Sequence, residues 1–417
     1  MHIGVLSDPE NFHTQKWAYG LQEAGAKVTI FSFSDYELPG ITCVKVPPRF
    51  TFKGELTYAS FLYSGPGLAK WLKSFRVDIL NPVNVTPYGV WGLQSGFRPM
   101  ISMAMGADIL EYPPDEKDLS VPLDRTWSSQ AAGQTSLWQR NMYSIKWKRF
   151  RKEVQRVLEN SDLIFGDNMQ LVHAVRDWFQ IPAERVLLNR WGIDPALFEP
   201  KPEEEAALRQ RYNIRDWQQV VLSPRGMKPI YQGDLILGAF ERLVRRGVRD
   251  ANMIMLGTGY DIPAELEAKA KDLEAHYPNF HLETELLSRK TLGSLWHLTD
   301  ICVNAPAYDG FSNALCEARY TGTVPLVNDI PAHREVLEPD VHARYIDPFT
   351  PEHLADAIMD TMERFDSLRP VMAAANGKWI RQHAMLAVNM ERFLKSCRQV
   401  MLIYRTRKAY QIGSFKK

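Results

Sequence analysis

Asp309 and Glu317 are two carboxylates eight positions apart in the segment AYDGFSNALCEARYTGTVPLVND, residues 307 to 329. Ser312 lies between them where a helix N-cap would stand, which would leave the amides of the first helical turn free for phosphate oxygens. Glu317 would lie in the second turn, where a carboxylate can accept two hydrogen bonds from a vicinal diol such as a ribose. Gly310 would let the backbone approach such a ligand closely. A helix-capping turn with two solvated acids is the alternative, and the segment alone favours neither.

Two cations precede this segment. Arg225 and Lys228 lie in SPRGMKPIYQGD, residues 223 to 234, which we interpret as the end of a strand, a loop and the start of a helix. The pair suits a diphosphate leaving group, because a planar guanidinium binds two oxygens and an ammonium supplies a point charge. Cations are also common in surface loops, and these residues alone leave that alternative open.

A glycine pair, Gly257 and Gly259, follows the apolar run ANMIML and would let a nucleotide approach the backbone. A single GxG is weak evidence, and the chain nowhere completes the dinucleotide fingerprint GxGxxG, so hydride transfer is disfavoured. The chain also lacks an Asp-x-Asp sequence. We therefore expect no metal ion on the diphosphate, whose charge positive side chains and helix N-termini would stabilise instead.

The elements that must position these residues alternate between strands and helices. The first thirty residues predict strand, loop, helix and strand, with Gly25 at a helix C-cap. Such a unit forms a parallel sheet and puts its first loop, residues 8 to 15, at the carboxyl edge where open α/β sheets bind ligands. More apolar runs follow at VDILNPV, RPMISMAM, DLIFGD and LLNRWGI, with helical stretches at 58 to 75, 138 to 160 and 169 to 179.

Near Pro200 the composition shifts to the proline- and charge-rich EPKPEEEAALRQRYNI, and a new strand follows at 219 to 223. The alternation then repeats, with helices at 233 to 247, 262 to 275 and 288 to 298 and strands between them. We predict an α/β fold of two Rossmann-like, doubly wound parallel-sheet domains that face each other across a cleft. The first domain spans 1–198 and the second begins at 199.

Composition narrows the function class. The chain has 417 residues, 45% of them hydrophobic, and a formal net charge of +1, which gives no reason to expect nucleic acid as a partner. Its four cysteines form no CxxC, so neither a disulfide framework nor a zinc site is indicated. The short apolar start predicts no signal peptide, and we expect a cytoplasmic protein.

Together these motifs resemble the large retaining family of GT-B nucleotide-sugar glycosyltransferases that includes bacterial mannosyltransferases and sucrose synthases (glycosyltransferase family 4-like). The resemblance covers most of the chain. It is carried by SDLIFGD and LLNRWGIDPALF at 161 to 198, Arg225 with Lys228, MLGTG at 255 to 259, and the acid, seven residues and glutamate pattern that ends at Glu317. It implies an enzyme that moves a hexose from a nucleotide diphosphate sugar, with UDP or GDP as nucleotide, to an acceptor in glycan biosynthesis.

The resemblance also implies roles for single residues. Glu317 would bind the ribose, Asp309 the hydroxyls of the donor sugar, and Arg225 with Lys228 the diphosphate. The backbone would help to hold the sugar and phosphates at Phe311, Ser312, Asn313 and Ala314. Residues 199–376 would form the nucleotide-sugar domain, 1–198 the acceptor side, and 377–417 a helical segment that returns to the N-terminal domain. No cofactor is implied, since the nucleotide sugar is a co-substrate.

Three departures from the family pattern stand out. Asp309 replaces the usual glutamate, the usual lysine position falls near Tyr231, and Met105 occupies the place of a histidine. Two acceptor-side candidates remain, His13 in the first loop and Asp108, with packing and helix capping as their respective alternatives. The departures leave open a nucleotide-sugar-binding protein without transferase activity, or a GT-B sugar-nucleotide epimerase.

The acceptor is unidentified and can be a glycan, a lipid or a small molecule. The stretch 138–157 alternates aromatic and basic residues at helical spacing, which is typical of a helix on an anionic membrane surface. A helix packed on the core with a solvated basic face is the alternative. The sequence thus predicts a cytoplasmic protein and leaves peripheral membrane association open.

Overall fold

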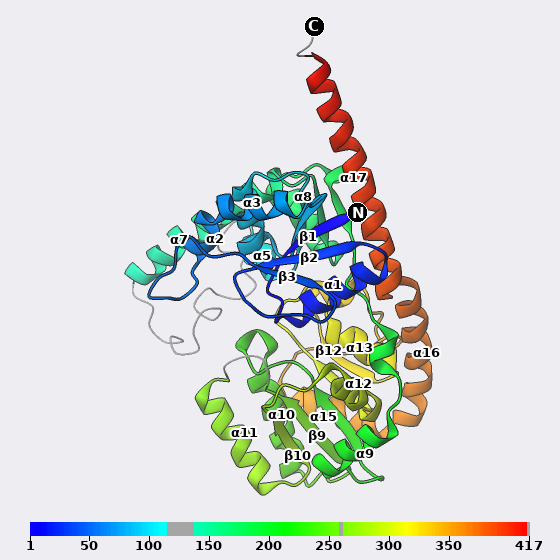
Figure 1. Ribbon diagram of the computed structural model, residues 1–417. Helices are drawn as coiled ribbons and strands as arrows, with labels where there is room; N and C mark the ends of the chain where they lie inside the picture. The colour runs from blue at the N-terminus through cyan, green and yellow to red at the C-terminus, as the bar shows by residue number, and fades with distance from the viewer. Residues whose placement is uncertain (115–136, 258–261, 415–417) are drawn as a thin grey trace. The chain divides into compact units, whose positions relative to one another are not determined.

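The computed structural model describes residues 1–114, 137–257 and 262–414, and the chain divides into two compact units (Figure 1). Unit 1 comprises the described residues of 1–191 and 386–414, and unit 2 those of 192–385. The sequence prediction placed these boundaries at 198 and 376. The structure places them at Trp191 and Met385, so the connection between the units precedes the proline- and charge-rich segment.

Unit 1 is a parallel α/β unit. Its strands run in the order β3-β2-β1-β4, and a second set runs β5-β6-β7. Parallel bridges from Leu80 to Met100 and from Val83 to Met103 join β4 to β5. The strands are β1 (His2–Leu6), β2 (Lys27–Ser32), β3 (Thr42–Lys45), β4 (Ile79–Pro82), β5 (Ile101–Ala104), β6 (Leu163–Gly166) and β7 (Val186–Leu188).

Helices flank the sheet of unit 1 (Figure 1). They are α1 (Phe12–Glu23), α2 (Tyr58–Tyr63), α3 (Gly65–Ser74), η1 (Val85–Gly89), α4 (Val90–Ser95), α5 (Ala107–Leu110), α7 (Leu137–Glu159), α8 (Met169–Phe179), η3 (Ala183–Arg185) and α17 (Leu386–Ser414). The buried ring of Phe393 on α17 contacts the ring of Trp17 on α1 with centroids 4.9 Å apart. The last helix of the chain therefore completes the core of the first unit.

Unit 2 has a six-stranded parallel sheet in the order β10-β9-β8-β11-β12-β13. Its strands are β8 (Gln219–Ser223), β9 (Ala251–Leu256), β10 (Phe280–Glu283), β11 (Ile301–Asn304), β12 (Val324–Asn328) and β13 (Arg344–Ile346). This order has its topological switch point between β8 and β11, where successive crossovers leave the sheet on opposite sides. Open α/β sheets bind their ligands outside the carboxyl ends of the strands at such a point.

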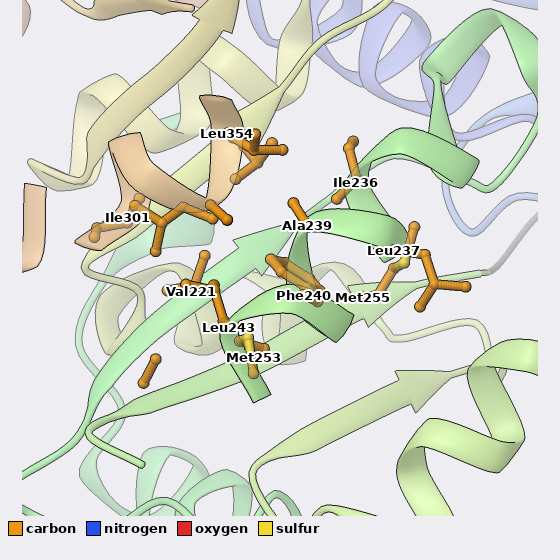
Figure 2. Close-up of a cluster of buried hydrophobic side chains, with 14 of the residues drawn as sticks. Val221, Ile236, Leu237, Ala239, Phe240, Leu243, Met253, Met255, Ile301 and Leu354 are labelled. Atoms are coloured by element: carbon orange, nitrogen blue, oxygen red, sulfur yellow. The ribbon is translucent and has the colours of Figure 1, made fainter. Parts of the chain in front are cut away.

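Helices flank the sheet of unit 2. They are η4 (Pro195–Phe198), α9 (Pro202–Arg211), η5 (Pro229–Tyr231), α10 (Gly233–Arg245), α11 (Ala264–His276), α12 (Arg289–Leu298), α13 (Asn313–Thr321), α14 (Pro331–Arg334), α15 (Pro351–Glu363) and α16 (Phe365–His383). Figure 2 shows one core cluster, in which Phe240 and Leu243 of α10 pack among side chains of β8, β9, β11 and α15. This packing fixes the strands whose ends carry the predicted site.

Candidate functional site

The strands of unit 2 bring the predicted cation and the predicted carboxylate together. Arg225 follows β8 and Asp309 follows β11, so both residues stand at the switch point. The Arg225 guanidinium donates to Asp309 Oδ2 at 3.0 Å and to Ser312 Oγ at 3.0 Å. Residues 84 positions apart in sequence thus form one polar cluster beside the start of α13.

The ring of Tyr231 lies under this cluster, with the Arg225 guanidinium 4.3 Å from its centroid. Burial alone would lower the pKa of Arg225, but the Asp309 carboxylate and the Tyr231 hydroxyl together outweigh burial and raise it. The guanidinium is therefore a permanent cation held between an anion and an aromatic face. Lys228 lies three residues further on, half-buried at the start of η5.

The start of α13 has the geometry that the sequence predicts. Ser312 is the N-cap and accepts a hydrogen bond from the amide of Leu315 at 3.3 Å. The amide of Gly310 donates to Asp309 Oδ1 at 2.9 Å, which fixes the carboxylate before the helix begins. Phe311 is buried, whereas Asn313 and Ala314 are half-buried at the first helical positions. Amides at a helix start favour anionic groups.

Glu317 is buried one turn further along α13, with only 3% of its surface exposed. Its Oε1 accepts from Arg289 at 2.5 Å and its Oε2 from the Trp296 indole at 3.0 Å. Both partners come from α12, where they are seven positions apart and hence on one helix face. The sequence analysis did not predict Arg289 and Trp296 as partners of Glu317. The only signal was their spacing of seven positions, which places both on one face of the predicted helix at 288 to 298.

Behind the cluster, the carboxyl ends of three neighbouring strands carry buried polar atoms. Ser223 Oγ, Asn304 Oδ1 and Asn328 Oδ1 have no hydrogen-bond partner within the described residues. Native proteins leave few such atoms, which a polar ligand or an ordered water satisfies. His333 lies beside them, and burial lowers the pKa of this histidine. Its neutral ring donates from Nδ1 to the carbonyl of Asn328 at 2.8 Å.

The glycine pair is only partly described. Gly257 follows β9 directly, and its amide donates to the carbonyl of Glu283 at 2.8 Å. A Cβ at this position would come within 2.6 Å of the Ile262 side chain, so close packing explains the glycine here. Gly259 lies outside the described residues, and its predicted role stays a prediction.

The two acceptor-side candidates belong to unit 1. His13 lies in the first turn of α1, half-buried, with its ring 5.6 Å from the ring of Trp191. Asp108 is buried and accepts from the amides of Val85 at 2.7 Å and Met105 at 2.8 Å. Burial raises its pKa to about 6, although these backbone hydrogen bonds oppose the shift. Asp108 therefore holds together the loops that follow β4 and β5.

The predicted membrane stretch 138–157 forms most of α7. In its described part, Trp147 is buried and donates to the carbonyl of Glu111 at 2.9 Å. The ring of Phe150 packs on Tyr58 with centroids 4.9 Å apart. Trp147 and Phe150 therefore face the protein, as the alternative of a core-packed helix with a solvated basic side predicts. Peripheral membrane contact through the stretch 138–157 stays a prediction. In the part of the chain that the structure describes, no helix has the length and hydropathy of a membrane span.

Solved structures share this fold. Sucrose-phosphate synthase from Thermosynechococcus elongatus superposes with a TM-score of 0.73 at 13% identity, covering 97% of this chain and 100% of that one. The Anabaena protein HepE, solved in complex with UDP-glucose, gives 0.71 at 14% identity over 96% and 100%. A glycosyltransferase from Rickettsia africae gives 0.69 at 13% identity over 96% and 98%. The chain therefore has the GT-B fold.

Family models agree with this class. A model described as glycosyl transferase 4-like matches residues 2–132, and one described as glycosyl transferases group 1 matches residues 219–364. A search of curated proteins finds no significant sequence relative. The chain belongs to the glycosyltransferases, and both model descriptions support the transferase among the three functions that the sequence leaves open.

Proposed function

We propose that this glycosyltransferase moves a hexose from a nucleoside diphosphate sugar to an acceptor hydroxyl, with the donor bound in unit 2. The observation that carries the proposal is the cluster of Arg225, Asp309 and Ser312 at the switch point of the unit 2 sheet. The complex of HepE with UDP-glucose, in the same fold, supports this class of donor.

In the reaction, the bond between the anomeric carbon and the diphosphate breaks, and the diphosphate leaves with the bonding electrons. Arg225, Lys228 and the amides at the start of α13 stabilise the negative charge that develops. The acceptor oxygen bonds to the anomeric carbon and loses its proton. A nucleoside diphosphate and a glycoside are the products.

The remaining residues orient the donor. Asp309 accepts hydrogen bonds from the sugar, and Glu317, held by Arg289 and Trp296, accepts them from the ribose. We further propose retention of the anomeric configuration, metal-independent catalysis and a cytoplasmic location. The four cysteines, which form no disulfide, support the location.

A thermal-shift panel of nucleotides and nucleotide sugars tests the donor site. We expect Arg225→Ala and Glu317→Ala to abolish the shift that the best nucleotide gives, because each removes a charged hydrogen-bond partner. His276→Ala, an exposed change on α11, is the control. Unchanged shifts in both site variants would refute the assignment.

Turnover needs its own assay. Slow donor hydrolysis, followed by mass spectrometry with and without a chelator, identifies the donor and tests independence of metal. Once an acceptor is found, NMR of the first-formed glycoside gives its anomeric configuration. An inverted product would disprove the retaining mechanism.

A further inference from the structure

Unit 1 exposes a group of large apolar side chains between residues 46 and 77. Phe52 is 58% exposed and Tyr63 54%, although most large apolar side chains of the unit are buried. We define the aromatic-basic surface by its exposed apolar members, Phe50, Phe52, Leu56, Tyr63 and Trp71, and its exposed cations, Arg49, Lys53, Lys70, Lys73 and Arg76.

The loop before α2 contains a tight turn that carries exposed apolar side chains. Phe52 and Glu55 pair through reciprocal backbone hydrogen bonds of 3.0 and 2.9 Å, which closes a tight turn. Lys53 and Gly54 form its tip with φ of 50° and 84°. Glycine adopts this left-handed backbone without strain. The Phe52 ring thus stands next to the tip, with the Lys53 ammonium 5.7 Å from its centroid.

Two contacts join this loop to α2 and to the junction of α2 and α3. The amide of Arg49 donates to Ser64 Oγ at 2.8 Å, which anchors the loop at the junction of α2 and α3. The rings of Phe50 and Tyr63 lie 6.4 Å apart. Lys70 and Trp71 are exposed on α3, which packs on α2 (Figure 1).

The charge of this segment differs from that of the whole chain. Residues 46 to 77 contain five cations and one acid, Glu55, whereas the chain as a whole has a net charge of +1. Within the described ranges, none of the five cations forms an ion pair. Exposed apolar groups rimmed by uncompensated cations mark an interaction surface for an anionic partner that also has an apolar interior.

We propose that the aromatic-basic surface binds the surface of an anionic lipid bilayer. Phenylalanine and leucine side chains at a turn would enter the boundary between headgroups and acyl chains, and the cations would contact lipid phosphates. Phe50, Phe52 and Leu56 have no polar group with which to bind a hydrophilic polyanion. The proposal is independent of the donor site and of α7, whose described aromatic side chains are packed inside unit 1.

Sedimentation of the full chain with vesicles tests the proposal. We expect binding to phosphatidylcholine vesicles that contain phosphatidylglycerol, weaker binding to phosphatidylcholine alone, and loss of binding as the salt concentration rises. The double variant Phe50→Ser with Phe52→Ser should weaken binding on the order of tenfold. Lys70→Ala with Lys73→Ala should weaken it roughly twentyfold, since each cation near the bilayer contributes about a factor of five.

Control variants test whether vesicle binding depends on this surface and not on exposed aromatic or basic residues elsewhere. Trp217→Ser removes an aromatic side chain of unit 2 that is 63% exposed, and Lys148→Ala with Lys152→Ala removes two exposed cations of α7. Both should leave vesicle binding unchanged. Because Phe50 and Phe52 are exposed, we expect the phenylalanine variant to keep the melting temperature of the unchanged chain, and measuring it verifies folding.

Three results of the vesicle experiments would overturn the proposal. They are no binding to anionic vesicles, undiminished binding by the phenylalanine variant, and loss of binding in the α7 variant alone. Binding to a soluble polyanion such as dextran sulfate without binding to vesicles would assign the surface to an acidic polymer and would also overturn it.

Discussion

At the scale of single residues, Asp309 has two possible partners. It holds the Arg225 guanidinium at 3.0 Å, and the proposed diphosphate would need that same guanidinium. The carboxylate and the phosphate therefore compete for one cation. We expect a bound diphosphate to take over the Arg225 guanidinium, which would release Asp309 to accept hydrogen bonds from the donor sugar.

Asp309→Asn tests this competition. We expect the variant to bind a nucleoside diphosphate on the order of tenfold more tightly, because Arg225 loses its charged partner. Affinity for the nucleoside monophosphate should change little, and transfer should be lost. Isothermal titration calorimetry measures each affinity.

A double-mutant cycle with Arg225→Ala isolates the role of the pair. The gain in affinity should vanish in the Arg225→Ala background. A gain that persists there would show that Asp309 acts on the phosphates by direct repulsion, without Arg225.

Single residues of the site also differ in whether their contacts could be predicted from the sequence. Ser312 could be predicted as an N-cap because capping depends on neighbours within a few positions. The bonds from Arg289 and Trp296 to Glu317 depend on how α12 packs against α13, 28 and 21 positions away. Residue types alone do not encode such a distance. The role of Asp108 in joining two loops was missed for the same reason.

At the scale of elements, α13 depends on its cap. Ser312→Ala removes the hydrogen bond to the Leu315 amide and should lower the free energy of unfolding by about 1 kcal/mol. It also removes a partner of Arg225, so nucleotide affinity should fall several-fold. Chemical denaturation and calorimetry measure the two effects.

Thr350→Ala is the matched control, because Thr350 caps α15 by accepting from the His353 amide at 3.2 Å. It should cost similar stability and leave nucleotide binding intact. Equal losses of affinity in both variants would mean that Ser312 acts only through stability.

The elements with strong local signals could be predicted closely. The strand at 219 to 223 and the helix at 169 to 179 coincide with β8 and α8. The stretch 58 to 75 is instead two helices, because α3 starts at Gly65 with Pro66 in its first turn. The predicted helical segment 377–417 divides between α16 and α17 at residues 384 and 385, where no glycine or proline signals the break.

At the scale of the whole molecule, the two units differ in whether their residues are contiguous in sequence. The described residues of unit 2 form one continuous range of sequence, 192–385, apart from 258–261. Unit 1 takes six buried core residues from the last helix: Leu386, Met390, Phe393, Leu394, Cys397 and Val400. Without that helix, the core of unit 1 would expose a large apolar face to water.

Fragments test this difference. Residues 192–385 alone should unfold cooperatively and bind nucleotide. Residues 1–191 alone should lack a cooperative transition and gain one when the peptide 386–417 is added. Circular dichroism on heating measures both, with the full chain as control. A cooperative 1–191 fragment would show that α17 is dispensable for folding.

The return of the chain to unit 1 sets an order of events during synthesis on the ribosome. The first 191 residues emerge first, yet the residues that complete their core are made last, after the whole of unit 2. At 5–20 residues per second, roughly ten seconds or more pass between Trp191 and Val400. During that interval unit 1 has an open core, and a chaperone that shields apolar surfaces would bind it there, while unit 2 has all of its own sequence and can fold.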